Sequence, residues 1–179
     1  MPNIPVQHKT IQIQHKTQTR ANDCWYACIQ MLRTYRAGKK SKPDGAGVRA
    51  HRNEKMLFHW ELVWGHKLGE NDPQFKNILK SNNLIDVGGE VPFIDVGYIQ
   101  DALNKHGPLM VLGDFCSIGV KEFGHWVVIT GTLPKDKLHI HDPAWLIFRG
   151  GERTVARSWL REKRYDRSPV IANHPTAWE

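Results

Sequence analysis

The sequence lacks any apolar run long enough to cross a membrane, since no stretch of about 18 apolar residues occurs in it. Residues 1–17, MPNIPVQHKTIQIQHKT, also lack the short apolar core of a secretory signal, so we expect no signal peptide. Cysteine is scarce, with Cys24, Cys28 and Cys116 as the full set. Such a small, odd number argues against a disulfide framework and indicates a reducing compartment.

Acidic residues are outnumbered by basic ones, 18 against 25, which gives a formal net charge of +7. A positive excess of this kind is one signal of nucleic-acid binding. Part of the excess is concentrated toward the C-terminus, in Arg153, Arg157, Arg161, Lys163, Arg164 and Arg167. We interpret this cluster as a solvated helix face, because charge runs are usually that. We therefore expect neither nucleic acid nor a membrane as a partner.

The remaining composition is that of a folded protein, with 40% hydrophobic residues and seven tryptophans. A length of 179 residues suits one core, so we expect a single domain over 1–179. Residues 1–13 and 165–179 would be peripheral or mobile. Apolar and polar residues alternate around Ile11 and Ile13, which indicates an extended segment ahead of the first helix.

The front half of the sequence is typical of helices and the back half of strands. Helices are predicted at 24–36, 54–65, 73–82 and 95–106, with a loop at 38–53 that is rich in Gly, Lys and Arg. Strands are predicted at 108–113, 125–130, 138–141 and 146–148, separated by turn signals. This separation predicts an α+β fold, in which an N-terminal helical layer packs on a C-terminal twisted antiparallel sheet.

Residues 18–29, QTRANDCWYACI, place Cys24 at the predicted start of a helix, with Asn22 or Asp23 as its N-cap. The thiolate is the nucleophilic form of cysteine, and a helix N-terminus and a nearby imidazolium both favour it. The position of Cys24 satisfies the first condition. We therefore interpret Cys24 as a candidate nucleophile that needs a histidine from elsewhere in the chain.

The stretches FGHWVVITGT and LHIHDPAW supply a histidine and a carboxylate for this thiol. His125 lies at the start of one predicted strand and Asp142 at the end of the next, and the turn Pro134-Lys135-Asp136 would pair the two strands. His125 would act as the base and Asp142 would orient its ring. Gln18 and the backbone N–H of Cys24 would donate to the oxyanion that forms on the substrate carbonyl.

These pieces together resemble the papain-like cysteine peptidases. CWYAC, KHGPLM, HWVVITG and HDP are similar to stretches of the type III effector proteases that plant-pathogenic bacteria inject. The bacteriocin-processing peptidases that cut after double glycine are a more distant likeness. The resemblance implies a papain-like fold with Cys24, His125, Asp142 and Gln18 in the roles given above.

The same resemblance implies a substrate cleft flanked by Trp25 and Trp126, with Gly124 leaving room beside the base. It implies no cofactor and no metal. The substrate would be a protein of a host or rival bacterial cell, and an immunity or inhibitor protein would be a further partner. The protein would be delivered by a secretion system and act in a reducing cytosol.

Other interpretations of these residues stay open. Cys24 and Cys28 could be core residues, or they could bind zinc together with His139 and His141. Asp142 could simply open a turn before Pro143, because Asp-Pro often does so. Asn173 or Asp166 would then be the alternatives for orienting the histidine.

The function also has alternatives. A Cys-His pair serves transglutaminases, deamidases, acyltransferases and cell-wall amidases, and the motif does not distinguish water from an amine as the second nucleophile. A non-enzymatic alternative is an inactive peptidase scaffold that binds nucleic acid or an acidic protein through its basic surface.

Overall fold

The structure is a computed structural model. It describes residues 7–18, 24–37, 77, 79–88, 91–118, 121–144, 150–164 and 168–174. Its helices are α1 (Cys24–Ala37), α5 (Val96–His106) and α6 (Arg157–Lys163). Its strands are β1 (Leu84–Asp86), β2 (Leu109–Ile118), β3 (Lys121–Leu133), β4 (Lys137–Asp142), β5 (Gly151–Ala156) and β6 (Val170–Asn173). The predicted loop at 38–53 and the predicted elements at 54–65 and 146–148 lie outside the described residues.

The strands form one sheet in the order β1-β6-β2-β3-β4-β5, and every neighbouring pair is antiparallel. The central strands β2, β3 and β4 follow one another along the chain. The β3–β4 turn includes Lys135 and Asp136, whose φ angles of 62° and 55° lie in the left-handed region. Asp tolerates this region better than most residues, and the turn sets the β3–β4 register. The predicted α+β fold with an antiparallel sheet is confirmed.

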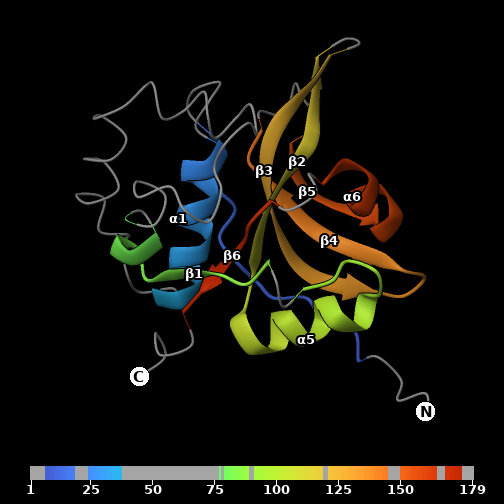
Figure 1. Cartoon of the computed structure of the whole chain (residues 1–179), viewed down its shortest axis with the longest axis horizontal. Helices are drawn as coiled ribbons and strands as arrows, with labels where there is room; N and C mark the ends of the chain where they lie inside the picture. The colour runs from blue at the N-terminus through green and yellow to red at the C-terminus, as the bar shows by residue number, and fades with distance from the viewer. Residues whose placement is uncertain are drawn as a thin grey trace.

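Helices cover both faces of the sheet, with α1 on one side and α5 and α6 on the other (Figure 1). The cause is the two-residue period of the strands, which sends successive side chains to opposite faces. On β3, Trp126 and Val128 pack in the α1 cluster, while Val127 and Ile129 pack in the cluster that includes α5 and α6. The sheet therefore has a hydrophobic core on each face.

Helix α1 confirms the prediction for 24–36, while its predicted N-cap lies outside the described residues. Helix α5 confirms the prediction for 95–106. Its N-cap is Asp95, whose carboxylate accepts a hydrogen bond from the backbone N–H of Gly97. It ends at Gly107, whose φ of 76° suits glycine.

Parts of the two segments expected to be peripheral or mobile, 1–13 and 165–179, pair with the sheet where the structure describes them. Residues 170–173 form β6, which is wholly buried between β1 and β2. Near the N-terminus, Ile11 is buried and its N–H donates to the carbonyl of Thr130, while Thr10 bridges Gly131. Both segments gain order from pairing with residues far away in sequence.

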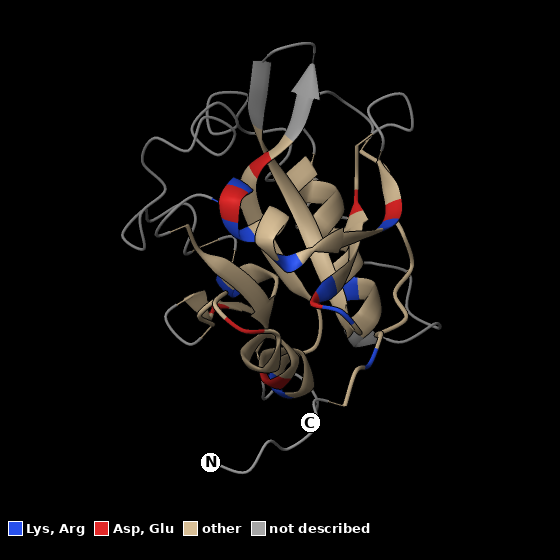
Figure 2. Cartoon of the chain, turned by 90° about the vertical axis from the view of Figure 1, so that its right-hand side faces the viewer, with Lys and Arg blue, Asp and Glu red and all other residues tan. Residues whose placement is uncertain are grey.

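The basic cluster predicted to be a solvated helix face is instead spread over a strand and a helix. Arg153 lies on β5, while Arg157, Arg161 and Lys163 lie on α6. Figure 2 shows basic and acidic residues interspersed over the described part of the face in view. Among the described residues, no helix has the length and apolar character needed to cross a membrane.

Candidate active site

Cys24 is the first residue of α1 and is 2% exposed. The backbone N–H groups of a helix's first turn have no partner inside the helix, and the helix dipole adds partial positive charge there. Helix α1 packs against β3, which places its N-terminal thiol beside the strand that carries His125. The position suits a negatively charged sulfur.

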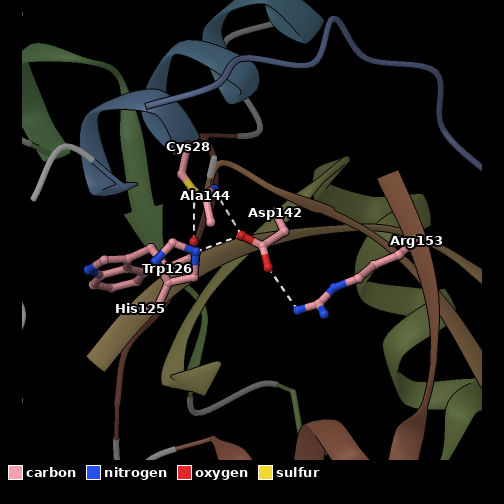
Figure 3. A network of polar contacts seen from close by, with 6 residues as sticks. All are labelled: Cys28, His125, Trp126, Asp142, Ala144 and Arg153. Carbon is pink, nitrogen blue, oxygen red and sulfur yellow. Dashed lines mark hydrogen bonds and ion pairs between the residues drawn. The ribbon is translucent and has the colours of Figure 1, made fainter. Parts of the chain in front are cut away.

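His125 and Asp142 form a buried hydrogen-bonded pair (Figure 3). His125 Nε2 lies 2.6 Å from Asp142 Oδ1, and their side chains are 5% and 2% exposed. They come from adjacent strands, β3 and β4, whose register pairs Val128 with His141. The strand pairing expected from the turn at 134–136 therefore brings the two predicted residues together.

Asp142 has two more partners that hold its carboxylate in place. Its Oδ1 accepts a hydrogen bond from the backbone N–H of Ala144 at 3.0 Å. Its Oδ2 accepts one from the guanidinium of Arg153 on β5 at 2.7 Å. Arg153 in turn lies over the ring of Trp159, with 5.1 Å between its guanidinium carbon and the ring centroid. A carboxylate held from three sides has a fixed orientation toward His125.

The pKa of His125 is raised to about 9. Burial alone lowers this pKa, but hydrogen bonds with Asp142 and Cys24, together with the charges of those two groups, outweigh burial. His125 is consequently an imidazolium at neutral pH. The same contact shows that the Cys24 thiol lies within hydrogen-bonding reach of the ring.

Gln18 is buried at the end of the described N-terminal segment. Its backbone N–H donates to the carbonyl of Pro143 at 2.8 Å, which fixes Gln18 next to Asp142 at the end of β4. The sequence between Gln18 and Cys24 lies outside the described residues. The structure thus places Gln18 beside the His125–Asp142 pair.

Cys28 lies one turn after Cys24 and is fully buried. Its thiol donates to the backbone carbonyl of Trp126 at 3.4 Å, and burial, followed by the charges of Cys24 and Asp142, raises its pKa well above the usual value. Both cysteines are free thiols. Neither joins His139 and His141 in the cluster of potential metal ligands found among the described residues, so the structure does not bring the alternative zinc set together.

The other residues considered from the sequence lie as follows. Asn173 is buried and donates to the carbonyl of Leu32, so it is engaged with α1, and Asp166 lies outside the described residues. Trp126 has no exposed surface because it packs in the core under α1, which places its ring away from solvent. Trp25 is also buried, and Gly124 is half-buried.

Arg153 is the residue of this site that sequence reasoning missed. The signal was present in GERTVA, where alternation and β-branched residues are typical of a strand. The observed burial alternates between half-buried and exposed along β5. Predicting 151–156 as a strand next to β4 would have placed the Arg153 guanidinium within reach of Asp142.

A comparison with models of known protein families gives a match. A family model described as papain-like cysteine protease AvrRpt2 matches residues 5–153. The matched range includes Gln18, Cys24, His125, Asp142 and Arg153. No curated protein matches the sequence significantly.

Proposed function

The chain belongs to the papain-like cysteine protease AvrRpt2 family, and on this premise we propose that it hydrolyses peptide bonds with Cys24 as the nucleophile. His125 is the general base and acid, and Asp142 orients its ring. Gln18 stabilises the oxyanion. The observation that carries this proposal is the buried His125–Asp142 pair at 2.6 Å, with Cys24 as the other hydrogen-bonding partner of His125.

The geometry gives the two ring nitrogens of His125 different partners and therefore different roles. Nε2 is engaged by Asp142, so Nδ1 is the nitrogen that faces Cys24 and holds the thiol proton in a thiolate–imidazolium pair. The sulfur then attacks the substrate carbonyl carbon. The backbone N–H of Cys24 and the side-chain amide of Gln18 donate to the oxygen that becomes negatively charged.

Collapse of the tetrahedral intermediate breaks the peptide C–N bond, and His125 returns its proton to the departing amine. The acyl group remains on the Cys24 sulfur as a thioester. His125 next takes a proton from water, and the resulting hydroxide attacks the thioester carbon. Carboxylic acid leaves, the sulfur regains its starting state, and no cofactor takes part.

We further propose a setting for this reaction. The family is that of a bacterial effector, whose substrate is a protein. The proposed substrate belongs to a host or rival cell, and delivery by a secretion system brings the enzyme to a reducing cytosol. Free thiols at Cys24 and Cys28 fit such a compartment. An immunity or inhibitor protein in the producing cell would be the accompanying partner.

The test is labelling with an epoxide inactivator of cysteine peptidases, followed by intact mass and peptide mapping. We expect rapid modification at Cys24 alone, and at least a hundredfold slower labelling in His125→Ala. Cys28 serves as the internal control, because its buried thiol with a raised pKa should stay unmodified. Slow labelling shared among the three cysteines would contradict the proposal.

Cleavage itself needs a second measurement. The enzyme is incubated with a denatured protein mixture, and new N-termini are counted against the Cys24→Ala variant. We expect termini that depend on Cys24. Transfer to an added primary amine without new termini would instead assign the thiol to an acyltransferase.

A further inference from the structure

Two histidines and a glutamate gather on the end of the sheet formed by β4 and β5, outside the proposed active site. One potential ligand atom from each of His139, His141 and Glu152 lies within 4.8 Å of the others. The cause is simple strand geometry. His139 and His141 are two residues apart on β4 and share a face, and Glu152 on β5 is the register partner of His141.

A contact with Thr130 orients the His139 ring so that its other nitrogen can bind a metal. Its Nδ1 lies 2.8 Å from the Thr130 hydroxyl, and that hydroxyl donates to the backbone carbonyl of His139. In the tautomer that suits metal binding, Nδ1 carries the hydrogen and the Thr130 hydroxyl accepts it. The lone pair of His139 is then on Nε2. Metal-binding histidines are typically held in this way by a hydrogen bond at their second nitrogen.

His141 is buried and has a nitrogen that no described group uses. It is 2% exposed, and its Nδ1 has no hydrogen-bond partner among the described residues. The nearest carboxylate oxygen, on Glu152, lies 3.9 Å away, which is too long for a hydrogen bond. A buried polar atom without a partner is costly, so its persistence calls for an explanation.

His15 from the N-terminal segment covers this group. Its ring stacks on that of His141, with 5.6 Å between centroids and an interplanar angle of 27°. The His15 Nδ1 is also buried without a hydrogen-bond partner among the described residues. Two imidazoles and one carboxylate thus have ligand atoms close together, and a third imidazole stacks on one of them.

We propose that His139, His141 and Glu152 bind a divalent transition-metal ion, with Zn²⁺ as the ion that this donor set suits best. Two imidazoles and one carboxylate are a recurrent three-ligand set for zinc, with a fourth position open. His15 lies outside this three-ligand group and contacts it through the stacking of its ring on His141. The proposed site is separate from Cys24 and Cys28 and differs from a thiolate site.

The three ligand atoms need to move only slightly closer together to bind an ion. Zinc bonds of about 2.0–2.1 Å in a tetrahedral arrangement separate ligand atoms by roughly 3.4 Å. The Glu152 side chain is 55% exposed, so it has room to approach His141 from 3.9 Å. A dication would also favour the approach, since Glu152 supplies the negative charge at this point.

The proposed metal ligands are sequence neighbours of the residues that hold His125. On β4, His141 precedes Asp142, and on β5, Glu152 precedes Arg153. His141 pairs with Glu152 in the register of the two strands, and Asp142 accepts a hydrogen bond from Arg153. A metal that clamps β4 to β5 therefore steadies the strands that present Asp142.

The test measures metal binding directly, on tag-free protein in a Cys24→Ala background, so that the proposed catalytic thiol offers no competing ligand. Titration calorimetry with Zn²⁺ should show a single equivalent per chain, and zinc should raise the melting temperature. Co²⁺ should give the visible absorption of a tetrahedral site without the thiolate charge-transfer band. His174→Gln is the matched control and should bind as the parent does.

Glu152→Gln is the decisive variant, because Glu152 is exposed and its replacement leaves the core intact. We expect it and His139→Gln to weaken zinc binding at least tenfold, and Thr130→Val to weaken it about tenfold through loss of the orienting bond. Absence of zinc binding in the Cys24→Ala protein would overturn the proposal. Unchanged affinity in Glu152→Gln and His139→Gln would overturn it equally.

Discussion

Arg153 donates a hydrogen bond to Oδ2 of Asp142 at 2.7 Å, from the strand next to the one that carries the carboxylate. The other oxygen of Asp142 faces His125. One oxygen of the carboxylate therefore bonds to Arg153, which positions it, and the other bonds to His125, the proposed base. It also gives a basic residue of the C-terminal part of the chain a role close to the proposed chemistry.

Replacing Arg153 with glutamine should lower kcat about tenfold while leaving KM unchanged, because Asp142 would lose the group that fixes its orientation. Arg153→Lys should restore little, since an ammonium lacks the planar fork of the guanidinium. Arg161→Gln on the exposed side of α6 is the matched control and should behave as wild type. An equal rise in KM with unchanged kcat would argue against a positioning role.

The raised pKa of His125 predicts how stability changes with pH. A histidine whose folded pKa is about 9, against an ordinary 6.5, stabilises the fold fully below pH 6.5, and this contribution disappears as pH rises through 9. Urea unfolding should therefore show a loss of up to about 3 kcal/mol between pH 6 and pH 10. In His125→Gln the loss should shrink. Equal pH dependence in both proteins would contradict the assignment.

Activity should follow the same ionisation. Because the departing amine takes its proton from imidazolium, kcat/KM should fall at high pH with a midpoint near 9. Asp142→Asn removes the carboxylate charge that supports this pKa, so the midpoint should move to lower pH. A pH–rate profile of both proteins on a peptide substrate measures the shift. An alkaline midpoint that is the same in both would rule out Asp142 as its cause.

Gly131 is the point on β3 where the N-terminal segment crosses. A Cβ there would lie 2.7 Å from the carbonyl oxygen of Lys9 and 2.8 Å from Cα of Thr10. Gly131→Ala should therefore push the segment away and destabilise the protein by about 1–3 kcal/mol. Activity should fall as well, because the same segment carries Gln18. Limited proteolysis should cut residues 7–18 faster, and an unchanged rate would refute the argument.

Cys28→Ala tests packing separately from reactivity. Removing a fully buried thiol that donates to Trp126 should cost about 1–2 kcal/mol of unfolding free energy. Labelling of Cys24 should proceed as before, because Cys28 supports the helix and takes no part in the proton transfers. Loss of Cys24 labelling in a folded Cys28→Ala protein would give Cys28 a chemical role.

Local patterns explain why much of the molecule could be predicted from its sequence. Helix α5 has start and stop residues, Asp95 and Gly107, that act within one or two turns. His125 and Asp142 could be paired in advance because a short turn at 134–136 leaves antiparallel strands little choice of partner. The predicted strands were too short, since β2 and β3 extend well beyond their apolar runs.

The parts that could not be predicted depend on pairing between distant segments. Strand β6 is a four-residue stretch, and its place between β1 and β2 follows from the partners that bury it. The contact of Arg153 with Asp142 depends on β5 lying beside β4, and the stacking of His15 on His141 depends on the N-terminal segment folding back. No local pattern contains this information.

The position of β6 also bears on when the protein becomes competent during its synthesis. Every residue of the proposed active site, from Gln18 to Arg153, is made before residue 170. Yet helix α1 packs on Ile171, and Asn173 donates to the carbonyl of Leu32 within α1. Strand β1 joins the sheet through β6 as well. In a nascent chain the proposed nucleophile is therefore made before the surface that docks its helix, so we expect the proposed activity only after the C-terminal strand has emerged.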